Sequence, residues 1–250
     1  MGNVIDKTFA ILELIAATVP EPMLPGRLAK ELKINRTTCS RLLKQLMDMG
    51  YLIKVSRQQG YIPGPKFLTM HNLVRFQDNY LKIATPVIDR CAEELKASIL
   101  TAQIYSGERY ILYHQNRSPF EVYIAQASFN DIFQTATGVL LVAYSSKEER
   151  VQCYRKFKKN GAQVCLPGFS SETEMHETLD KVVKLGYVKD KLYYWLYAYP
   201  VFRNGKIFAA LGASITEEQH TKAYHKKISN VLQDAANEIS RNLSLKHAIG

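Results

Sequence analysis

Hydrophobic positions recur at helical spacing along the first fifty residues. Apolar side chains three or four positions apart predict a first helix over residues 4–18, which the prolines of PEPMLP at 20–25 end. The pattern then predicts a short helix over PGRLAKEL (25–32) and a longer one over residues 36 to about 49, with Asn35 as its N-cap. The apolar positions of the first helix are Ile5, Phe9, Leu12 and Ile15.

A short hairpin is expected after the helical pair. Gly50 closes the second helix, as glycine commonly does after a last helical residue. The strand-like segment YLIKV (51–55), the polar turn SRQQG and the short strand YIP then predict two strands joined by a basic loop. Two such strands directly after a pair of helices form a β-wing, and a linker helix over residues 65–76 is expected next.

From residue 80 onward the pattern alternates between helices and strands. A helix over 80–97 contains Pro86, which predicts a bend or a new helix start there. Gly107 and the pair Asn204-Gly205 mark two hairpins, and Ser171-x-x-Glu174 has the sequence of a capping box. Strands that pair as hairpins before helices intervene predict an α+β domain around a largely antiparallel sheet. The expected strands are 98–106, 109–115, 120–127, 194–202 and 206–214, and the expected helices are 137–144, 146–159, 171–185 and 218–245.

The composition includes an excess of positive charge, which bears on the partners of the protein. The 250 residues are 46% hydrophobic and 22% charged, as in ordinary globular proteins, but the formal net charge is +10. Such an excess favours a polyanionic partner such as DNA, RNA or an anionic membrane. No apolar run approaches the roughly 18 residues of a membrane span, and no signal-peptide pattern is present, so we expect a cytoplasmic protein without membrane contact. The cysteines, expected to be reduced and mostly buried, are Cys39, Cys91, Cys153 and Cys165.

The helical pair has the sequence features of a helix-turn-helix. Ala29 supplies the small residue where two steeply crossed helices approach each other, and Ile34 supplies the apolar plug of the turn. Many such turns carry glycine where Lys33 stands, so we expect strain or a different geometry at that residue. The inward positions of the second helix are Cys39, Leu42 and Leu46.

Polar and basic side chains fill the positions between the inward ones. The first residues of such a helix contact base edges in the major groove, and a basic wing reaches the backbone or the minor groove. A solvated helical hairpin with ordinary surface charges is the alternative for an isolated pair. The preceding helix, the wing and the positive charge of the chain together favour a DNA-reading module. The candidate DNA-binding residues are Arg36, Thr37, Thr38, Ser40, Arg41, Lys44, Arg57 and Gln58.

These segments together resemble the IclR family of bacterial transcriptional regulators. The resemblance rests on AILELIA, LPGRLAKELKINRTTCSRLLKQLMDMGYLIK and GYIPGPKFL, and continues more loosely through QTATGVLLVAYSS, LGYVKD and YPVFRNGKIFAALGAS. It implies a winged helix-turn-helix over residues 1–64, a linker helix over 65–79 and a GAF-like effector-binding domain over 80–250. It also implies a homodimer or homotetramer that binds double-stranded operator DNA and responds to a small effector.

The same resemblance places an effector pocket in the C-terminal half, where the sequence departs from the family. The family's usual GK pair becomes Gly138-Val139, and Leu196 stands where a cysteine is usual. Because hydroxyl, thiol and charged groups are lost, we expect an apolar or aromatic effector rather than a polar carboxylate. Asp190 and Ser214 remain as polar anchors. The implied effector-binding residues are Thr135, Gly138, Asp190, Tyr194, Leu196, Gly212 and Ser214.

The segment LYYWLYAY (192–199) is open to two interpretations. Its aromatic side chains form the lip of the effector pocket, or alternate members belong to the core while the rest are exposed or at a subunit interface. A third possibility is that no small effector binds. The aromatic members are Tyr193, Tyr194, Trp195, Tyr197 and Tyr199.

The sequence lacks the common catalytic motifs. It contains no GxSxG, HExxH, P-loop or GxGxxG motif, so we expect neither an enzyme nor a metal site nor a cofactor. We predict a transcriptional regulator whose apolar first helix contacts a second copy of the chain. The alternative is a ligand-binding sensor or assembly protein whose winged helix contacts protein instead of operator DNA. The residues expected at the contact between copies are Phe9, Leu12 and Ile15.

Overall fold

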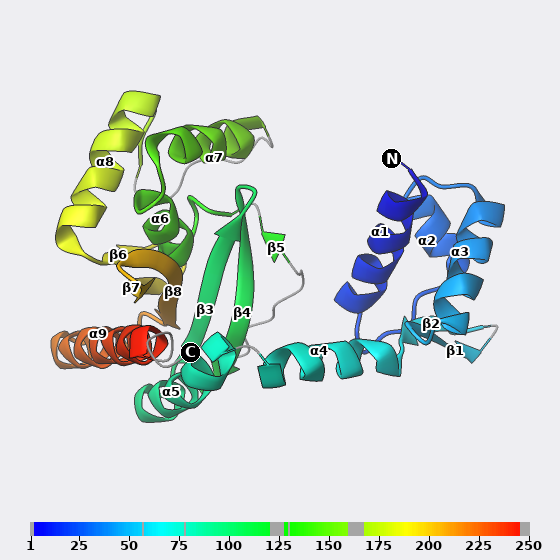
Figure 1. Cartoon of the computed structure of the whole chain (residues 1–250), viewed down its shortest axis with the longest axis horizontal. Helices are drawn as coiled ribbons and strands as arrows, with labels where there is room; N and C mark the ends of the chain where they lie inside the picture. Colours follow the sequence, from blue (N-terminus) through cyan, green and yellow to red (C-terminus); the bar gives the residue numbers. More distant parts are fainter. Residues whose placement is uncertain are drawn as a thin grey trace. The chain divides into compact units, whose positions relative to one another are not determined.

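The chain forms two units, seen in a computed structural model that describes residues 3–56, 58–77, 79–120, 128–129, 131–159 and 168–245. The N-terminal unit ends at residue 78, and the C-terminal unit begins at Asn79. Figure 1 shows the first in blue to cyan and the second in cyan-green to red. Among the described helices, none combines the length and apolar character needed to cross a membrane.

The N-terminal unit consists of helices and one two-stranded antiparallel sheet, as the pattern predicted. Its helices pack around a shared apolar core, and its strands form the hairpin that follows the third helix (Figure 1). The elements are α1 (Val4–Ala17), α2 (Pro25–Glu31), α3 (Arg36–Asp48), β1 (Leu52–Ser56), β2 (Gly60–Pro63) and α4 (Pro65–Gln77).

Helix α1 divides its predicted apolar positions between the core and the surface. Ile11, Leu12 and Ile15 are buried in the core of the unit. Ile5 and Phe9 are 64% and 59% exposed, because the helical repeat turns them away from that core. The expected contact of Leu12 and Ile15 with a second copy is therefore wrong, and Phe9 is the member of that set that remains accessible.

The first turn of α4 is held against the end of α3 and the start of the hairpin. The backbone N–H of Gly64 donates to the carbonyl oxygen of Tyr51 at 2.7 Å, and that of Lys66 donates to Gly50 at 3.2 Å. The rings of Tyr51 and Phe67 meet edge to face with centroids 5.6 Å apart. A Cβ atom at Gly64 would collide with the Gly50 carbonyl, so glycine is required for this close approach.

The C-terminal unit contains a six-stranded sheet in the order β5-β4-β3-β8-β7-β6. Every neighbouring pair is antiparallel, which confirms the predicted sheet type. The strands are β3 (Ser98–Tyr105), β4 (Glu108–Asn116), β5 (Ser128–Phe129), β6 (Val188–Lys191), β7 (Trp195–Arg203) and β8 (Lys206–Ile215).

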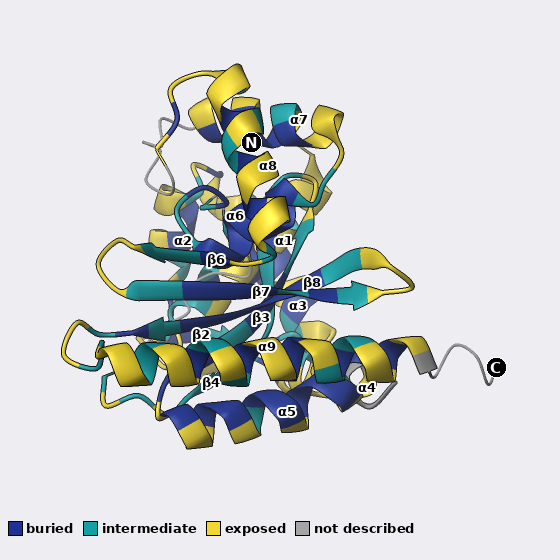
Figure 2. Ribbon diagram, turned by 90° about the vertical axis from the view of Figure 1, so that its left-hand side faces the viewer, coloured by how far each residue is buried: buried dark blue, intermediate teal, exposed yellow. Residues whose placement is uncertain are grey.

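Helices cover both faces of this sheet. Figure 2 shows α5 (Asn79–Leu95) and α9 (Lys222–Leu245) on one face and α6 (Ala136–Ala143), α7 (Lys147–Lys159) and α8 (Glu172–Leu185) on the other. Each layer has its own apolar core, one under α5 and α9 and one under α6 to α8. Because strand residues alternate between faces, adjacent residues of one strand enter different cores.

Helix α5 passes through Pro86 without a break, so the predicted new helix start there is wrong, whereas the bend stays a prediction. Proline removes one backbone N–H donor and so one helical hydrogen bond. The burial of Ala84, Val87 and Ile88 against the sheet stabilises the helix without that bond. Strand β6 was not predicted, and α9 begins at Lys222 instead of 218 because Thr216 and Gln219 close a turn first.

Two further sequence predictions have mixed outcomes. Ser171 caps α8 as predicted, but the Glu174 carboxylate accepts from the backbone and hydroxyl of Ser170 instead of completing the box. Residues 121–127 of the expected strand 120–127 lie outside the described residues. Among the cysteines, Cys39, Cys91 and Cys153 are free and buried, whereas Cys165 is not among the described residues.

We predict that Gly64→Ala destabilises the N-terminal unit by about 1–3 kcal/mol, because the added methyl overlaps the Gly50 backbone. Gly26→Ala is the matched control, since a Cβ there meets nothing within 4 Å and alanine favours the helix. Hydrogen exchange of the amides in α3 and β1 measures the stability of this unit. Equal protection in the two variants would contradict the close approach of Gly64 to the Gly50 backbone.

Candidate nucleic-acid interface and effector site

The turn between α2 and α3 sets the angle of the two helices. Ala29 is buried where the helices meet, and the backbone N–H of Ile34 donates to the Ala29 carbonyl at 3.0 Å. Ile34 is also buried and fills the turn, as predicted. Lys33 adopts a φ of +52°, the left-handed region that usually favours glycine. Lys33, which stands where many such turns carry glycine, therefore has a backbone conformation that costs lysine free energy.

Helix α3 is fixed at its start by a side-chain cap and along its length by one apolar face. The Asn35 side-chain oxygen accepts a hydrogen bond from the backbone N–H of Thr37 at 2.8 Å, which satisfies one free donor of the first turn. The opposite end is closed by Gly50 with φ of +79°. The buried residues of the helix are Cys39, Leu42, Leu43 and Leu46.

The outward face of α3 carries the predicted polar and basic residues. Thr37, Arg41 and Lys44 are exposed and follow the i, i+4, i+7 spacing of one face, opposite the buried residues. Arg36 and Ser40 are exposed along one flank, and Thr38 is half-buried. Arg36, Arg41 and Lys44 have no ion-pair partner among the described residues, so their charges are available to an anion.

The hairpin after α3 presents further polar side chains. Gln58 is exposed in its turn, and the Ser56 hydroxyl accepts from the backbone N–H of Gln59 at 2.9 Å. Arg57 lies outside the described residues. Together α3 and this hairpin have the arrangement of a winged helix-turn-helix.

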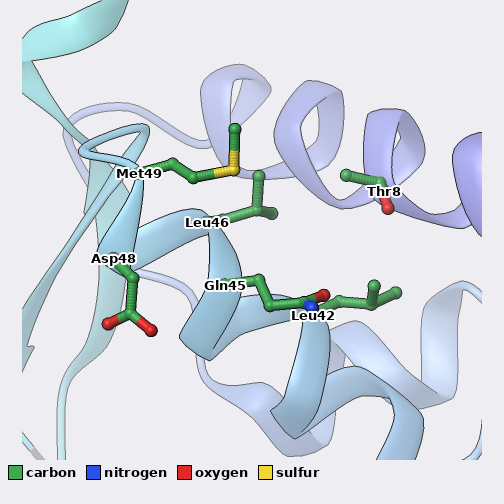
Figure 3. A pocket seen from close by; sticks show the side chains of 6 residues that line it. All are labelled: Thr8, Leu42, Gln45, Leu46, Asp48 and Met49. Carbon is green, nitrogen blue, oxygen red and sulfur yellow. The ribbon is translucent and has the colours of Figure 1, made fainter.

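A hollow of about 350 Å³ lies beside α3, on the side where α1 packs (Figure 3). Thr8 of α1 lines it together with residues from the second half of α3. Apolar side chains of α1 and the α3 end are exposed in the same unit, at 64% for Ile5 and 54% for Met49. The residues from α3 and its cap that line the hollow are Leu42, Gln45, Leu46, Asp48 and Met49.

In the C-terminal unit, Gly212 lets α6 lie directly on the sheet, and Gly138 lets the segment before α6 pass close to the first turn of that helix. A Cβ at Gly212 of β8 would collide with the Thr137 methyl, and one at Gly138 would collide with the Ile132 backbone. The Thr135 hydroxyl caps α6 by accepting from the backbone N–H of Gly138 at 3.2 Å. Thr135 and Gly138 thus have structural roles at the start of α6, beside the sheet row that contains Gly212.

The neighbouring sheet row brings together three of the predicted effector-binding residues. Asp190 pairs with Leu196, and Leu196 pairs with Ser214, across β6, β7 and β8. The row continues into β3, where Ser98 pairs with Ser214. These side chains are on the α6 side of the sheet, since Leu196 packs on that core.

Two polar residues of this face were missed from the sequence. Ser98 is buried, and its hydroxyl lies 2.9 Å from Nε2 of His114 on β4. Burial lowers the pKa of His114, which favours a neutral ring near pH 7. Their place beside Ser214 follows from the pairing of β3 with β8, which no short motif signals.

The aromatic segment divides between the two faces of the sheet. Tyr197 and Tyr199 are buried in the core under α5 and α9, so they do not form a lip for a pocket on the α6 side. Tyr193 is 87% exposed. Tyr194 stacks on Phe120 with ring centroids 5.3 Å apart and an interplanar angle of 8°. Tyr194, directly before β7, therefore remains a candidate for the effector site.

Comparison with known families decides the nature of the N-terminal unit. Residues 4–56 match the family model of the IclR helix-turn-helix domain. The N-terminal unit carries an IclR helix-turn-helix domain. This match contains α1 to α3 and β1, including every candidate DNA-binding residue of α3. No curated protein matches the sequence at a significant level.

Solved structures of IclR-type proteins share the fold of nearly the whole chain. An IclR transcriptional regulator from Alicyclobacillus acidocaldarius has a TM-score of 0.80 at 16% identity, covering 98% of this chain and 100% of that one. An IclR homolog from Microbacterium hydrocarbonoxydans, complexed with 4-hydroxybenzoate, has a TM-score of 0.76 at 15% identity, with coverages of 96% and 99%. IclR of Thermotoga maritima has a TM-score of 0.70 at 19% identity, with coverages of 96% and 98%. The predicted IclR-type α+β fold is confirmed.

Proposed function

We propose that the protein is a sequence-specific DNA-binding transcriptional regulator of the IclR type, whose DNA affinity responds to a small effector. The observation that carries this proposal is the outward face of α3. A helix inside an IclR helix-turn-helix domain presents Arg41 and Lys44 without ion-pair partners among the described residues. Positive side chains of this kind bind DNA phosphates and donate hydrogen bonds to base edges.

Each residue has a role set by its place on α3. Thr37 and Arg41, in the first half of the helix, would read base edges in the major groove, with Arg36 and Ser40 beside them. Thr38, half-buried on the flank of α3, would help to hold the helix in position in the major groove. Lys44, one turn further along, would contact a phosphate. Arg57 and Gln58 of the hairpin would reach the backbone or the minor groove.

We predict that Arg41→Ala lowers operator affinity by about 1–3 kcal/mol, roughly fivefold to 150-fold, because a bidentate base contact is lost. Lys44→Ala should weaken all sequences similarly and reduce the salt slope by about one, as expected for one phosphate contact. Fluorescence anisotropy with a genomic fragment at several salt concentrations measures both effects.

Lys181→Ala on α8, an exposed lysine of the C-terminal unit, is the matched control for charge. Its affinity and salt slope should equal those of the wild type. If Arg41→Ala and Lys44→Ala also bind like the wild type, α3 does not read DNA. The alternative function, a sensor or assembly protein whose winged helix contacts protein, would then be favoured.

Assembly into a homodimer is a second part of the proposal. Val4, Ile5 and Phe9 expose a connected apolar edge of α1, and the hollow between α1 and α3 lies in the same unit. A unit of this size has little reason to leave so much apolar area in water. A second copy would bury these side chains and place two recognition helices on one operator. Two such dimers would form a tetramer.

We predict that Phe9→Glu weakens this contact, because a carboxylate at a site that is 59% exposed in the single chain would be buried between copies. Sedimentation should show a shift toward smaller species on dilution, and binding to a two-half-site operator should lose its cooperativity. Tyr105→Glu, at an exposed aromatic position at the end of β3 in the C-terminal unit, is the control. An unchanged mass and unchanged cooperativity for Phe9→Glu would place the contact elsewhere.

The effector would bind the α6 side of the sheet. The row of Asp190, Leu196 and Ser214 offers two polar groups around an apolar residue, and Ser98 with His114 extends it by a hydroxyl and a neutral imidazole. Tyr194 stacked on Phe120 supplies an aromatic surface in the same unit. This chemistry suits a small aromatic molecule with one hydroxyl group. The complex of the Microbacterium homolog with 4-hydroxybenzoate supports that class.

We predict that 4-hydroxybenzoate or a close aromatic analogue raises the melting temperature of the wild type, because it binds the folded state. Ser214→Ala should weaken binding about threefold to tenfold by removing one hydrogen bond. Ser145→Ala, just beyond the other end of α6, should bind like the wild type. Calorimetric titration measures all three proteins. Equal weakening by both serine variants would exclude this row as the site.

A further inference from the structure

A cluster of ionisable and aromatic side chains lies on the α9 side of the sheet, on the face opposite the proposed effector site. His225, in the first turn of α9, is at its centre. Nζ of Lys189 on β6 lies 2.6 Å from Nε2 of His225. The hydroxyl of Tyr197 on β7 lies 2.7 Å from Nδ1 of the same ring. One imidazole therefore connects an edge strand, a central strand and the C-terminal helix.

These two contacts determine the protonation state of the ring. An ammonium group can donate but not accept, so Nε2 of His225 accepts from Lys189 and carries no proton. Nδ1 then carries the proton and donates to the oxygen of Tyr197. Burial, followed by the positive charge of Lys189 and the neighbouring His220 ring, lowers the pKa of His225. The neutral ring is the form that fits the folded protein.

The surrounding groups do not favour a second positive charge at this place. The carboxylate of Glu217, in the turn before α9, is already engaged. It lies 2.6 Å from the Lys191 ammonium and accepts from Nε1 of Trp195 at 3.0 Å. The charged and titratable groups around the ring are Lys189 and Lys191 from β6, Tyr197 and Tyr199 from β7, Glu217 and His220 from the turn, and Tyr224 from α9 itself.

We propose that the contact Lys189–His225–Tyr197 is a pH-sensitive connection that holds β6 to α9 and opens when the His225 ring gains a proton. A protonated ring would place two cations 2.6 Å apart, so the ammonium must leave. Lys189 has another position nearby, because its Nζ is already 5.1 Å from the centroid of the Trp195 ring. Strand β6 can follow the movement, since it has four residues and pairs with β7 at the edge of the described sheet.

The direction of the pH effect follows from the neutral ring. A histidine whose pKa is lowered by folding stabilises the folded state above its ordinary pKa, about 6.5. That stabilisation is lost as the pH falls through the lowered value. Acidification should therefore weaken the attachment of β6 to α9, whereas mildly alkaline conditions should leave it intact.

The 250-residue chain offers a direct readout, because Trp195 is its one tryptophan and lies in this cluster. Histidine ring NMR and tryptophan fluorescence are followed from pH 8 to pH 5. The His225 signal, assigned with His225→Gln, should titrate below 6.5 and coincide with a fluorescence transition. Lys189→Met should move its midpoint upward by about one unit, because the adjacent ammonium is gone.

Lys191→Met is the matched control, since this lysine is two residues away on the same face of β6 but pairs with Glu217. Its effect on the His225 midpoint should be smaller than that of Lys189→Met. In His220→Gln, which removes the imidazole stacked on Trp195 at 3.8 Å, the transition should persist. A His225 midpoint at or above 6.5, a midpoint unmoved by Lys189→Met, or a transition retained in His225→Gln would overturn the proposal.

Discussion

The burial of one face of α3 is the constraint on which the N-terminal unit depends. Cys39, Leu42, Leu43 and Leu46 all lie in the core, so the helical repeat leaves no freedom for the remaining side chains. Thr37, Arg41 and Lys44 are therefore directed to the outside. The Asn35 cap and the Ile34 plug fix the end from which they project. A rigid basic surface is thus a direct consequence of packing the opposite side, and DNA reading needs a surface of this kind.

In the C-terminal unit, side chains alternate along β7, and this alternation fixes which residues face each side of the sheet. Tyr197 and Tyr199 enter the core beneath α5 and α9, whereas Leu196 and Ala198 face α6. One strand therefore supplies both the pH-sensitive cluster and the proposed effector row, and a shift of one residue would exchange them. Gly212 allows α6 to approach on the effector side. The two faces are chemically distinct although one strand contributes side chains to both.

The sequence predicted the elements that local chemistry determines. Gly50 and the pair Asn204-Gly205 adopt positive φ angles that these residues tolerate, so a helix end and a hairpin followed from them. Pro86 led to the wrong expectation of a new helix start, because the packing of α5 on the sheet outweighs the local preference of proline. Ser98 and His114 were missed since their relation to Ser214 depends on strand order, which distant segments decide together. The candidate DNA-binding residues of α3 could be named together from sequence because they lie within one helix, whose exposed side the helical repeat determines.

The most direct test of the account is to select bound fragments from the source genome with the purified protein at two salt concentrations and to footprint the best one. The account predicts a protected palindrome, with two half-sites related by a twofold axis and an affinity that falls steeply with salt. This result would establish α3 as the reader of a defined operator. Weak binding without a preferred sequence, with similar protection at every fragment, would contradict the central claim that the exposed face of α3 reads DNA.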